Sequence, residues 1–548
     1  MKVYEALARA FAAEGTTAVF DVMGDANMHW LNALNGLGVE IFDVRHEGAG
    51  LAMADGWARA SGQPGVCSTT SGPGTAQLAT TMVVASRART PLVAFCGDTA
   101  WGDAFDAQHF DQERFAAAIE CGFVRLTSPA AAYEAVQRAF YLARLESRPI
   151  MLSVPSDTQM REFTGDAVYT PSTAILPSAR IQPEPERIEA AAAVVTAAER
   201  PVLLVGRGAM RAGAGEVTVR LAERLGALIA TTLMAKNWLT GAEFHVGVSG
   251  GYATRTAREL LREADCVIAA GTSLSHYTTE RGALYGNARV VHIDVAPHRL
   301  MGDGRAAELY VQSDARLGLE ALEERLDGRP PATGFRTPDV AERIAAAWDD
   351  PAVYELEPGT VDPREACRIL DEAIPADFGL VLGSGQQVRF GTMLLRRERP
   401  RIVAQHHFGC IGQGLTTAMG VTIADGRRPT FVVEGDGGFM MHLAEFETAV
   451  RYDLPLLVVV MNDEGLGAEY HKSLAIGLDG DLALISTPDL GQVAVAMGGR
   501  GALIRSPGDL AAAAAEFAAA PAPTVLDVRI SRNVLSIPYQ RIFHGADV

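Results

Sequence analysis

The sequence predicts an α/β protein of three doubly wound domains, each with a parallel sheet between two layers of helices. The chain has 548 residues, more than one hydrophobic core usually supports, so several domains are expected. Short apolar runs alternate with helical patterns, and these runs lack the strict polar–apolar alternation of a sheet with one solvated face. Proline-containing irregular stretches at 171–188 and 328–363 separate three regions of similar size.

The first region, predicted to be a domain over 1–170, opens with a helix. Its apolar stripe is formed by Val3, Leu7, Ala10 and Phe11, and Gly15 ends it. Strands are predicted at 18–23, 40–45, 66–70, 91–97 and 149–155, with helical stretches between them.

The central and C-terminal regions repeat this alternation. We predict a central domain over 189–328, with strands at 201–206, 227–232, 266–271 and 290–295. We predict a C-terminal domain over 363–548, with strands at 380–385, 429–437, 455–463 and 523–530 and an alanine-rich helix at 510–520. Strands that alternate with helices in this way are typical of parallel sheets.

Charge and hydropathy exclude some classes of partner. Lys plus Arg is 48 and Asp plus Glu is 66, which gives a net charge of −18. Such an acidic chain repels phosphate backbones, so nucleic acid is not an expected partner. No apolar run has the length of a membrane span, and the opening helix lacks the apolar core of a signal peptide. We therefore expect a soluble cytoplasmic protein that does not bind membranes.

Two strand ends of the C-terminal region carry the strongest functional signal. One predicted strand ends in Gly435-Asp436-Gly437-Gly438, and the next ends in Asn462-Asp463-Glu464-Gly465. Glycines at such positions let backbone N–H groups approach a phosphate, and an Asp can ligate Mg²⁺. Asp436 and Asp463 are 27 positions apart, which is one strand–helix–strand unit, so neighbouring strands would place both beside one metal ion. Each turn alone is also explained as a helix cap.

This paired motif resembles the signature of the thiamine-diphosphate-dependent enzymes of the acetolactate synthase, pyruvate decarboxylase and benzoylformate decarboxylase group. The resemblance covers nearly the whole chain and implies that the first domain binds the pyrimidine and the third binds the diphosphate of thiamine diphosphate. It implies Mg²⁺ ligation by Asp436, Asp463 and the carbonyl of Gly465. The family has Asn where this chain has Asp463, a change that keeps an oxygen ligand and adds negative charge.

The resemblance also assigns an activating carboxylate. The segment Arg45–Gly50 reads RHEGAG, and relatives place their glutamate at the position of Glu47. There it would hydrogen-bond pyrimidine N1′ and so favour the tautomer whose imino group deprotonates the thiazolium. The alternative is a carboxylate that stabilises a helix N-terminus.

Further cofactor contacts follow from two other segments. In HHFGCIGQGL, residues 406–415, the resemblance implies that Ile411 wedges under the cofactor and that the backbone of Gly409 and Ile411 holds the aminopyrimidine. The segment LGSGQQ supplies Gly385, Gln386 and Gln387, which resemble residues that bind the far side of the diphosphate.

Substrate-side residues are inferred from the same resemblance, and each is also explained as an ordinary surface or helix residue. The proton-relay candidates are His29, His109 and Glu469. The candidates for contact with the substrate are Asn27, Met28, Ser68 and Gln112.

The central domain gives weak support for a second cofactor. Acetolactate synthases bind FAD there in a non-redox role, and PVLLVGRGAMRAG, residues 201–213, resembles a dinucleotide turn. The third glycine of G-x-G-x-x-G is missing, so FAD is an alternative that the sequence does not favour.

The family resemblance leaves the reaction open. The substrate would be a small carbonyl compound, a 2-oxo acid or a diketone, and the reaction a carboligation, a decarboxylation or a hydrolytic C–C cleavage. Glu469 fits decarboxylation, whereas Lys472 and Asp463 depart from the acetolactate synthase pattern. The resemblance implies a homodimer or homotetramer with active sites shared between subunits. Two rivals from other classes are an inactive cofactor-binding scaffold and a Mg²⁺-dependent phosphohydrolase.

Overall fold

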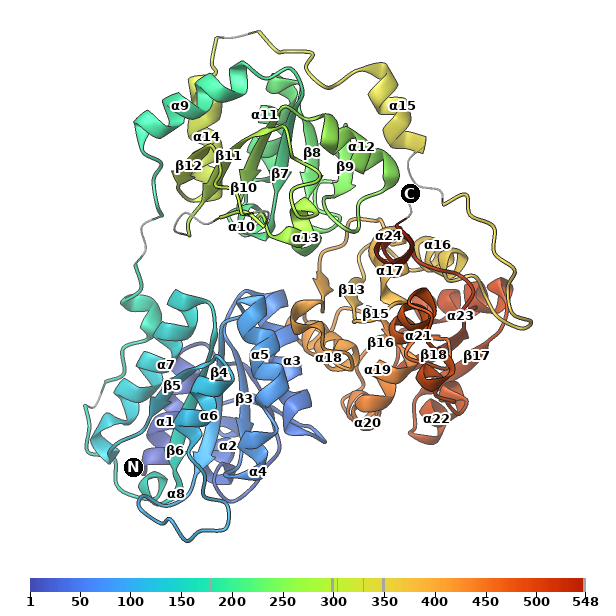
Figure 1. Ribbon diagram of the computed structural model, residues 1–548. Helices are drawn as coiled ribbons and strands as arrows, with labels where there is room; N and C mark the ends of the chain where they lie inside the picture. The colour runs from blue at the N-terminus through green and yellow to red at the C-terminus, as the bar shows by residue number, and fades with distance from the viewer. Residues whose placement is uncertain are drawn as a thin grey trace.

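The computed structural model describes residues 1–166, 168–177, 180–296, 300–302, 304–328, 330–346 and 350–545. It contains three parallel six-stranded sheets, each within one of the three regions that the sequence separates (Figure 1). Every strand pair within these sheets is parallel, as in β15–β16, β10–β7 and β3–β4. The predicted α/β class with three parallel sheets is therefore confirmed. No helix in the described ranges is long and apolar enough to cross a membrane.

The N-terminal sheet has the strand order β2-β1-β3-β4-β6-β5. Its elements are α1 Val3–Ala13, β1 Ala18–Asp21, α2 Met28–Asn35, β2 Glu40–Asp43, α3 Glu47–Ser61, β3 Gly65–Thr69, α4 Pro73–Ala76, α5 Ala79–Ala88, β4 Leu92–Asp98, α6 Gln112–Ala118, β5 Gly122–Arg125, α7 Ala132–Glu146, β6 Pro149–Pro155 and α8 Ser156–Gln159. Its chain then runs through an irregular segment to α9, which begins at Pro185 within the predicted linker.

The central sheet has the order β12-β11-β10-β7-β8-β9. Its elements are α9 Pro185–Thr196, β7 Pro201–Val205, α10 Arg207–Arg211, α11 Gly215–Leu225, β8 Leu228–Thr231, β9 His245–Val248, α12 Arg255–Glu263, β10 Cys266–Ala270, α13 His276–Thr279, β11 Arg289–Asp294, β12 Leu309–Gln312 and α14 Ala315–Arg325. A further helix, α15 (Pro338–Ala346), lies in the stretch that was expected to be irregular.

The C-terminal sheet has the order β14-β13-β15-β16-β18-β17. Its elements are α16 Pro363–Ala373, β13 Gly379–Leu382, α17 Val388–Leu394, β14 Ile402–Ala404, α18 Gly414–Ala424, β15 Thr430–Gly435, α19 Asp436–Met441, α20 Ala444–Arg451, β16 Leu456–Asn462, α21 Gly467–Ala475, α22 Leu490–Ala496, β17 Arg500–Ile504, α23 Pro507–Ala519, β18 Thr524–Arg529 and α24 Ile537–His544. The helix predicted at 510–520 is α23.

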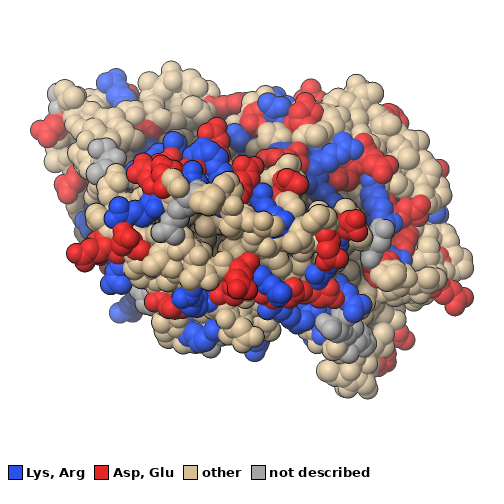
Figure 2. Space-filling view, turned by 90° about the horizontal axis from the view of Figure 1, so that it is seen from above, with Lys and Arg blue, Asp and Glu red and all other residues tan. Residues whose placement is uncertain are grey.

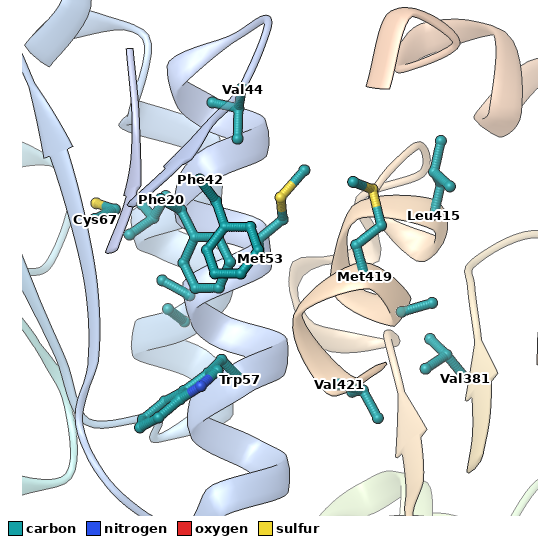
Figure 3. Packing of buried hydrophobic residues seen from close by; sticks show 14 of the residues in the cluster. Phe20, Phe42, Val44, Met53, Trp57, Cys67, Val381, Leu415, Met419 and Val421 are labelled. Atoms are coloured by element: carbon teal, nitrogen blue, oxygen red, sulfur yellow. The ribbon is translucent and has the colours of Figure 1, made fainter. Parts of the chain in front are cut away.

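The hydrophobic clusters show how these domains pack. Two clusters cover the two faces of the central sheet, and one cluster lies on a single face of each outer sheet. The fifth cluster contains residues of both outer sheets, because α3 and α18 lie against each other between them. Figure 3 shows Met53 of α3 and Met419 of α18 at this junction.

Surface charge does not segregate into a basic face. Seen from above in Figure 2, Lys and Arg side chains are interspersed with Asp and Glu side chains. This distribution gives no support for a nucleic-acid-binding patch on that face.

Candidate active site

Two buried carboxylates meet at the carboxyl edge of the C-terminal sheet. Strands β15 and β16 are adjacent and parallel, with Gly435 opposite Met461. Asp436 begins α19 directly after β15, and Asp463 directly follows β16. Their exposed fractions are 0% and 4%. The sheet therefore brings together the two acidic residues that the sequence pairs.

The raised pKa values and unpaired oxygens of these two carboxylates are what a cation-binding site would show. Burial raises the pKa of Asp436 to about 6. Burial and the neighbouring Asp436 carboxylate raise the pKa of Asp463 well above its usual value. Both carboxylate oxygens of Asp436 and Oδ1 of Asp463 are buried without a hydrogen-bond partner. Such orphaned oxygens suit a hard divalent cation, which would offset their mutual repulsion.

The described residues contain no cluster of three His, Cys, Asp or Glu side chains that could hold a metal ion. A site here would need main-chain or external ligands besides the two carboxylates. Gly465, the predicted main-chain ligand, is two residues after Asp463 and forms a β-bridge with Leu484. The donor set that the sequence suggests therefore fits Mg²⁺ with a phosphate group as a further ligand.

Glycines make room around the two carboxylates. A methyl group on Gly467 would overlap the carboxylate of Asp463, and it would also lie 3.4 Å from Gln386 Cγ. A methyl group on Gly435 would overlap the side-chain amide of Gln387. The segment Gly385–Gln387 therefore lies directly against the two loops that carry Asp436 and Asp463, with Gly385 in a left-handed conformation at φ 131°.

The loop between Asp463 and Gly465 is held from outside. Glu464 has a φ of 54°, a left-handed conformation that costs a non-glycine residue energy. Its carboxylate accepts a hydrogen bond of 2.7 Å from Arg529, and its N–H donates to Asn462 Oδ1 at 3.0 Å. Arg529 and Asn462 both also bind the buried carboxylate of Asp527. This network fixes the loop that carries Asp463.

The predicted aminopyrimidine segment lies beside α19, next to Gly438 and Met441. Phe408, Gly409 and Gly412 have φ values of 62°, 67° and 96°, so this stretch is irregular until α18 begins. His442 lies 2.7 Å from the carbonyl oxygen of Gly412 through its Nδ1. A methyl group on Gly412 would lie 3.4 Å from the carbonyl oxygen of Gly438. Ile411 is half-buried next to this contact.

Glu434 is a buried acid of this region that sequence analysis did not single out. Its side chain is fully buried, and its Oε2 accepts a hydrogen bond of 2.7 Å from the N–H of Gly414 at the start of α18. Burial raises its pKa to about 7. The sequence feature that could have identified Glu434 is that it is the one charged residue in the apolar run TFVVEG.

Glu47 begins α3 in the N-terminal domain and is half-buried. A methyl group on Gly74 would lie 3.1 Å from its Oε1, so the carboxylate faces the Gly72-Pro73-Gly74 turn. The preceding N–H groups of Arg45 and His46 donate to Glu445 Oε1 at 3.0 and 2.9 Å. Glu445, whose pKa is raised by burial, was also missed by sequence analysis.

A second bridge joins the start of α3 to the aminopyrimidine segment. Gln413 donates from Nε2 to Thr81 Oγ1 at 2.9 Å, and Thr81 donates to the carbonyl oxygen of Gly48 at 3.0 Å. Gly48, the residue after Glu47, is thus linked through the side chain of Thr81 to Gln413, two residues after Ile411.

Two of the residues predicted to contact the substrate, Asn27 and Gln112, form hydrogen bonds inside the N-terminal domain. Asn27 is fully buried, donates to Ser68 Oγ at 2.9 Å and accepts from the N–H of Gly24 at 2.7 Å. Gln112 is fully buried and donates to the carbonyl oxygen of Gly97 at 2.8 Å. Met28, half-buried, begins α2. The first of these contacts ties the loop after β1 to β3, and the second ties the start of α6 to β4.

The three predicted relay residues lie apart on the surface of the single chain. His29 is exposed in a shallow pocket with Asp25, Ser156 and Gln159, and its ring lies 5.4 Å from that of Tyr4. His109 is exposed and contacts Thr99 Oγ1 at 3.1 Å. Glu469 is exposed on α21 and pairs with Lys472 at 3.2 Å. The structure of one chain does not gather these three side chains.

The glycines of the central-domain turn have a packing role. A methyl group on Gly206 would overlap the carbonyl oxygen of Gly271, and one on Gly208 would lie 2.7 Å from Gly271 Cα. Close approach between the turns after β7 and β10 therefore explains both glycines without a nucleotide.

Three family models match the chain. The N-terminal TPP binding domain of thiamine pyrophosphate enzymes matches residues 1–119, their central domain matches residues 188–322, and their C-terminal TPP binding domain matches residues 383–528.

Curated relatives align over most of the chain. A probable 2-ketoarginine decarboxylase of Pseudomonas aeruginosa is 30% identical over 92% of this chain and 89% of its own length. A probable acetolactate synthase large subunit of Methanocaldococcus jannaschii is 28% identical over 97% of this chain and 92% of its own. A sulfoacetaldehyde acetyltransferase of Castellaniella defragrans is 29% identical over 85% of this chain and 81% of its own.

Proposed function

The chain belongs to the thiamine pyrophosphate enzyme family, and from this we propose that it uses thiamine diphosphate and Mg²⁺ to break or form a C–C bond beside the carbonyl group of a 2-oxo acid. The observation that carries the proposal is the pair of buried carboxylates, Asp436 and Asp463, with orphaned oxygens among glycines. The names of the relatives include a synthase, a decarboxylase and an acetyltransferase. We therefore propose the chemistry of the family and leave open whether the product is an aldehyde or a ligated ketone.

The residues of the C-terminal domain would hold the cofactor in this proposal. Asp436, Asp463 and the carbonyl of Gly465 would bind Mg²⁺. Backbone N–H groups of Gly435, Gly437 and Gly438 would approach the diphosphate, with Gln386 and Gln387 on its far side. Gly409 and Ile411 would position the aminopyrimidine.

The N-terminal domain, together with Glu469 of the C-terminal domain, would supply the proton chemistry. Bound thiamine diphosphate supplies a carbon nucleophile for the substrate carbonyl and an acceptor for the electrons of the broken bond. Glu47 would share a proton with pyrimidine N1′. His29, His109 and Glu469 are proposed to move protons at the substrate, and Asn27, Met28, Ser68 and Gln112 to shape its pocket.

We propose that the active form is a homodimer or homotetramer. In the single chain, Phe408 is 59% exposed and Met441 59% exposed, although both adjoin the proposed cofactor segment. A second subunit would cover these apolar side chains and bring its own relay residues to the site. Light scattering tests this, and a fully active monomer would contradict it.

Calorimetric titration of thiamine diphosphate in the presence of Mg²⁺ tests the cofactor assignment. We expect saturable binding to the wild type and its loss in Asp436→Asn, because one of the two charges that hold the metal is removed. Failure of the wild type to bind would refute the proposal. Stabilisation by sugar phosphates or nucleotides instead would support the phosphohydrolase rival.

Turnover tests the role of Glu47. With pyruvate, benzoylformate and a 1,2-dione as substrates, we expect Glu47→Gln to bind the cofactor but to lose at least about 100-fold in rate, a common size for lost acid–base catalysis. Glu469→Gln and His109→Ala test the relay separately. Unchanged turnover in Glu47→Gln would show that the assigned activation is wrong. Product analysis would distinguish carbon dioxide plus aldehyde, ligated ketone and ring-opened acid.

A further inference from the structure

Arg389 is a cation without an acidic partner near the proposed cofactor site. It lies in the first turn of α17, and its Nη1 and Nη2 donate to the hydroxyl groups of Tyr252 and Tyr539 at 3.1 and 3.2 Å. Its guanidinium lies 4.1 Å from the ring centre of Tyr539 and 5.7 Å from that of Tyr252. Within the described part of the chain, no Asp or Glu side chain pairs with it, and its Nε is buried without an acceptor.

The position of Arg389 links it to both proposed cofactor segments. Its N–H donates to the carbonyl oxygen of Gln386, the residue whose side chain adjoins Gly467, as the carboxylate of Asp463 also does. On the other side, the ring of Tyr252 lies 5.6 Å from that of His406, three residues before Gly409. The guanidinium therefore stands between the segment proposed for the diphosphate and the segment proposed for the aminopyrimidine.

Two other parts of the chain close over this point. Tyr539 belongs to α24 of the C-terminal tail, and Ser536 at the start of α24 lies 3.5 Å from Gln386 Oε1. Tyr252 belongs to a loop of the central domain, to which Arg541 of α24 donates hydrogen bonds at the carbonyl oxygens of Ala253 and Gly251. Figure 1 shows α24 beside α17, below the central domain. The tail, the central domain and α17 thus meet around one guanidinium.

The charge balance of this cluster is positive. The two tyrosines are neutral partners, and burial, followed by the charge of Arg389, lowers the pKa of His406 to about 4, so its ring is uncharged at neutral pH. A guanidinium has five N–H donors, and the tyrosines accept from two nitrogens only. An oxyanion would satisfy the remaining donors in a planar, two-pronged geometry that arginine favours.

We propose that Arg389 recognises an anionic group of the substrate that is remote from the reacting carbonyl. The substrate class would be a carbonyl compound with a carboxylate, sulfonate or phosphate at its far end. A reacting carboxylate is a poorer match, because a cation that stabilises a charge lost in the transition state would slow its loss. Tyr252 and Tyr539 would hold the guanidinium in place. This inference rests on the proposed function.

Binding of unreactive dianions tests the proposal without turnover. Malonate, succinate, glutarate and sulfoacetate are titrated into the protein saturated with thiamine diphosphate and Mg²⁺. We expect at least one of them to bind the wild type at least about tenfold more tightly than Arg389→Gln, a difference of about 1.4 kcal/mol. Arg389→Lys keeps the charge but not the fork, so an intermediate affinity is expected. Arg220→Gln, which removes a surface guanidinium paired with Glu323 in the central domain, should bind like the wild type.

The diphosphate of the cofactor is the other oxyanion that Arg389 could hold. The affinity of the Arg389→Gln variant for thiamine diphosphate distinguishes this alternative from an anionic group of the substrate. We expect thiamine diphosphate to bind Arg389→Gln within about twofold of the wild type. A parallel loss of cofactor affinity, or equal affinity of every dianion for wild type and variant, would overturn the proposal. Failure of the wild type to bind the cofactor would instead refute the proposed function, and the dianion comparison would still be readable on the cofactor-free protein.

Discussion

Asp21 is a buried acid whose carboxylate has no partner. It ends β1 with 0% of its surface exposed, and neither of its oxygens forms a hydrogen bond. Burial, assisted by the neighbouring Asp43, raises its pKa to about 8. Since an unfolded chain releases this proton near pH 4, the unfolded state binds fewer protons between these two values. The stability of the fold should therefore fall as the pH rises from about 4 to about 8.

We predict that Asp21→Asn removes this pH dependence. The amide has nearly the same shape and cannot ionise, so the variant should melt several degrees above the wild type at pH 8.5. The advantage should shrink towards pH 4, because each pH unit within the interval is worth about 1.4 kcal/mol. Scanning calorimetry across this range measures it. Glu216→Gln, which alters an exposed side chain, is the control, and a Tm difference independent of pH would show that the carboxyl is not titrating as described.

The residues of the candidate site were predictable where their chemistry is local in sequence. Asp436 and Asp463 each directly follow a strongly apolar strand. Because these two strands are adjacent and parallel, the sheet brings the two side chains together at the carboxyl ends of the strands. No local sequence pattern pointed to Glu445, Arg389 or Arg529, because each of them binds partners that are distant in the sequence. Glu445, for example, accepts hydrogen bonds from the N–H groups of Arg45 and His46. Long-range contacts of this kind leave no local pattern.

Among the elements, the strands that sequence analysis missed share one position. They are β5, β9, β12, β14 and β17, and every one of them lies at an edge of its sheet. β12 and β17 show why: they mix buried, half-buried and exposed residues, whereas β7 and β16 are buried throughout. A buried strand is a continuous apolar run, but an edge strand needs only a few apolar residues. Interior strands were therefore found and most edges were not.

The crossing of α3 and α18 depends on two glycines. A methyl group on Gly420 would overlap the carbonyl oxygen of Met53, and one on Gly56 would overlap that of Thr417. Both overlaps involve backbone of the opposite helix, which cannot rotate away. The two helices can pack this closely only because neither has a side chain at these positions.

We predict that Gly420→Ala destabilises the protein by at least about 2 kcal/mol, within the range of overpacked cores, although alanine favours the helix itself. Thermal unfolding measures the loss. Gly36→Ala is the matched control, because a methyl group there would meet only ordinary contacts at 3.5 Å. Equal stability of the two variants would mean that α3 and α18 separate without cost.

At the scale of the molecule, the outer domains share one hydrophobic cluster and the central domain has two of its own. Contacts between the central and C-terminal domains include polar ones, such as those of Asn237 Nδ2 with the carbonyl oxygens of Leu395 and Arg397. Since loss of a shared apolar core exposes both of its sides at once, the outer domains should unfold together.

We therefore predict two calorimetric transitions, one for the joined N- and C-terminal domains and one for the central domain. Thiamine diphosphate with Mg²⁺ should raise the midpoint of the first only, because the proposed ligands Glu47, Asp436 and Asp463 all belong to it. Trypsin cleavage at the exposed Arg180 tests this, since the N-terminal fragment should remain associated with the fragment that contains the C-terminal domain. Fragments that separate on gel filtration, or a cofactor shift confined to the central transition, would show that the α3–α18 junction does not hold the outer domains together.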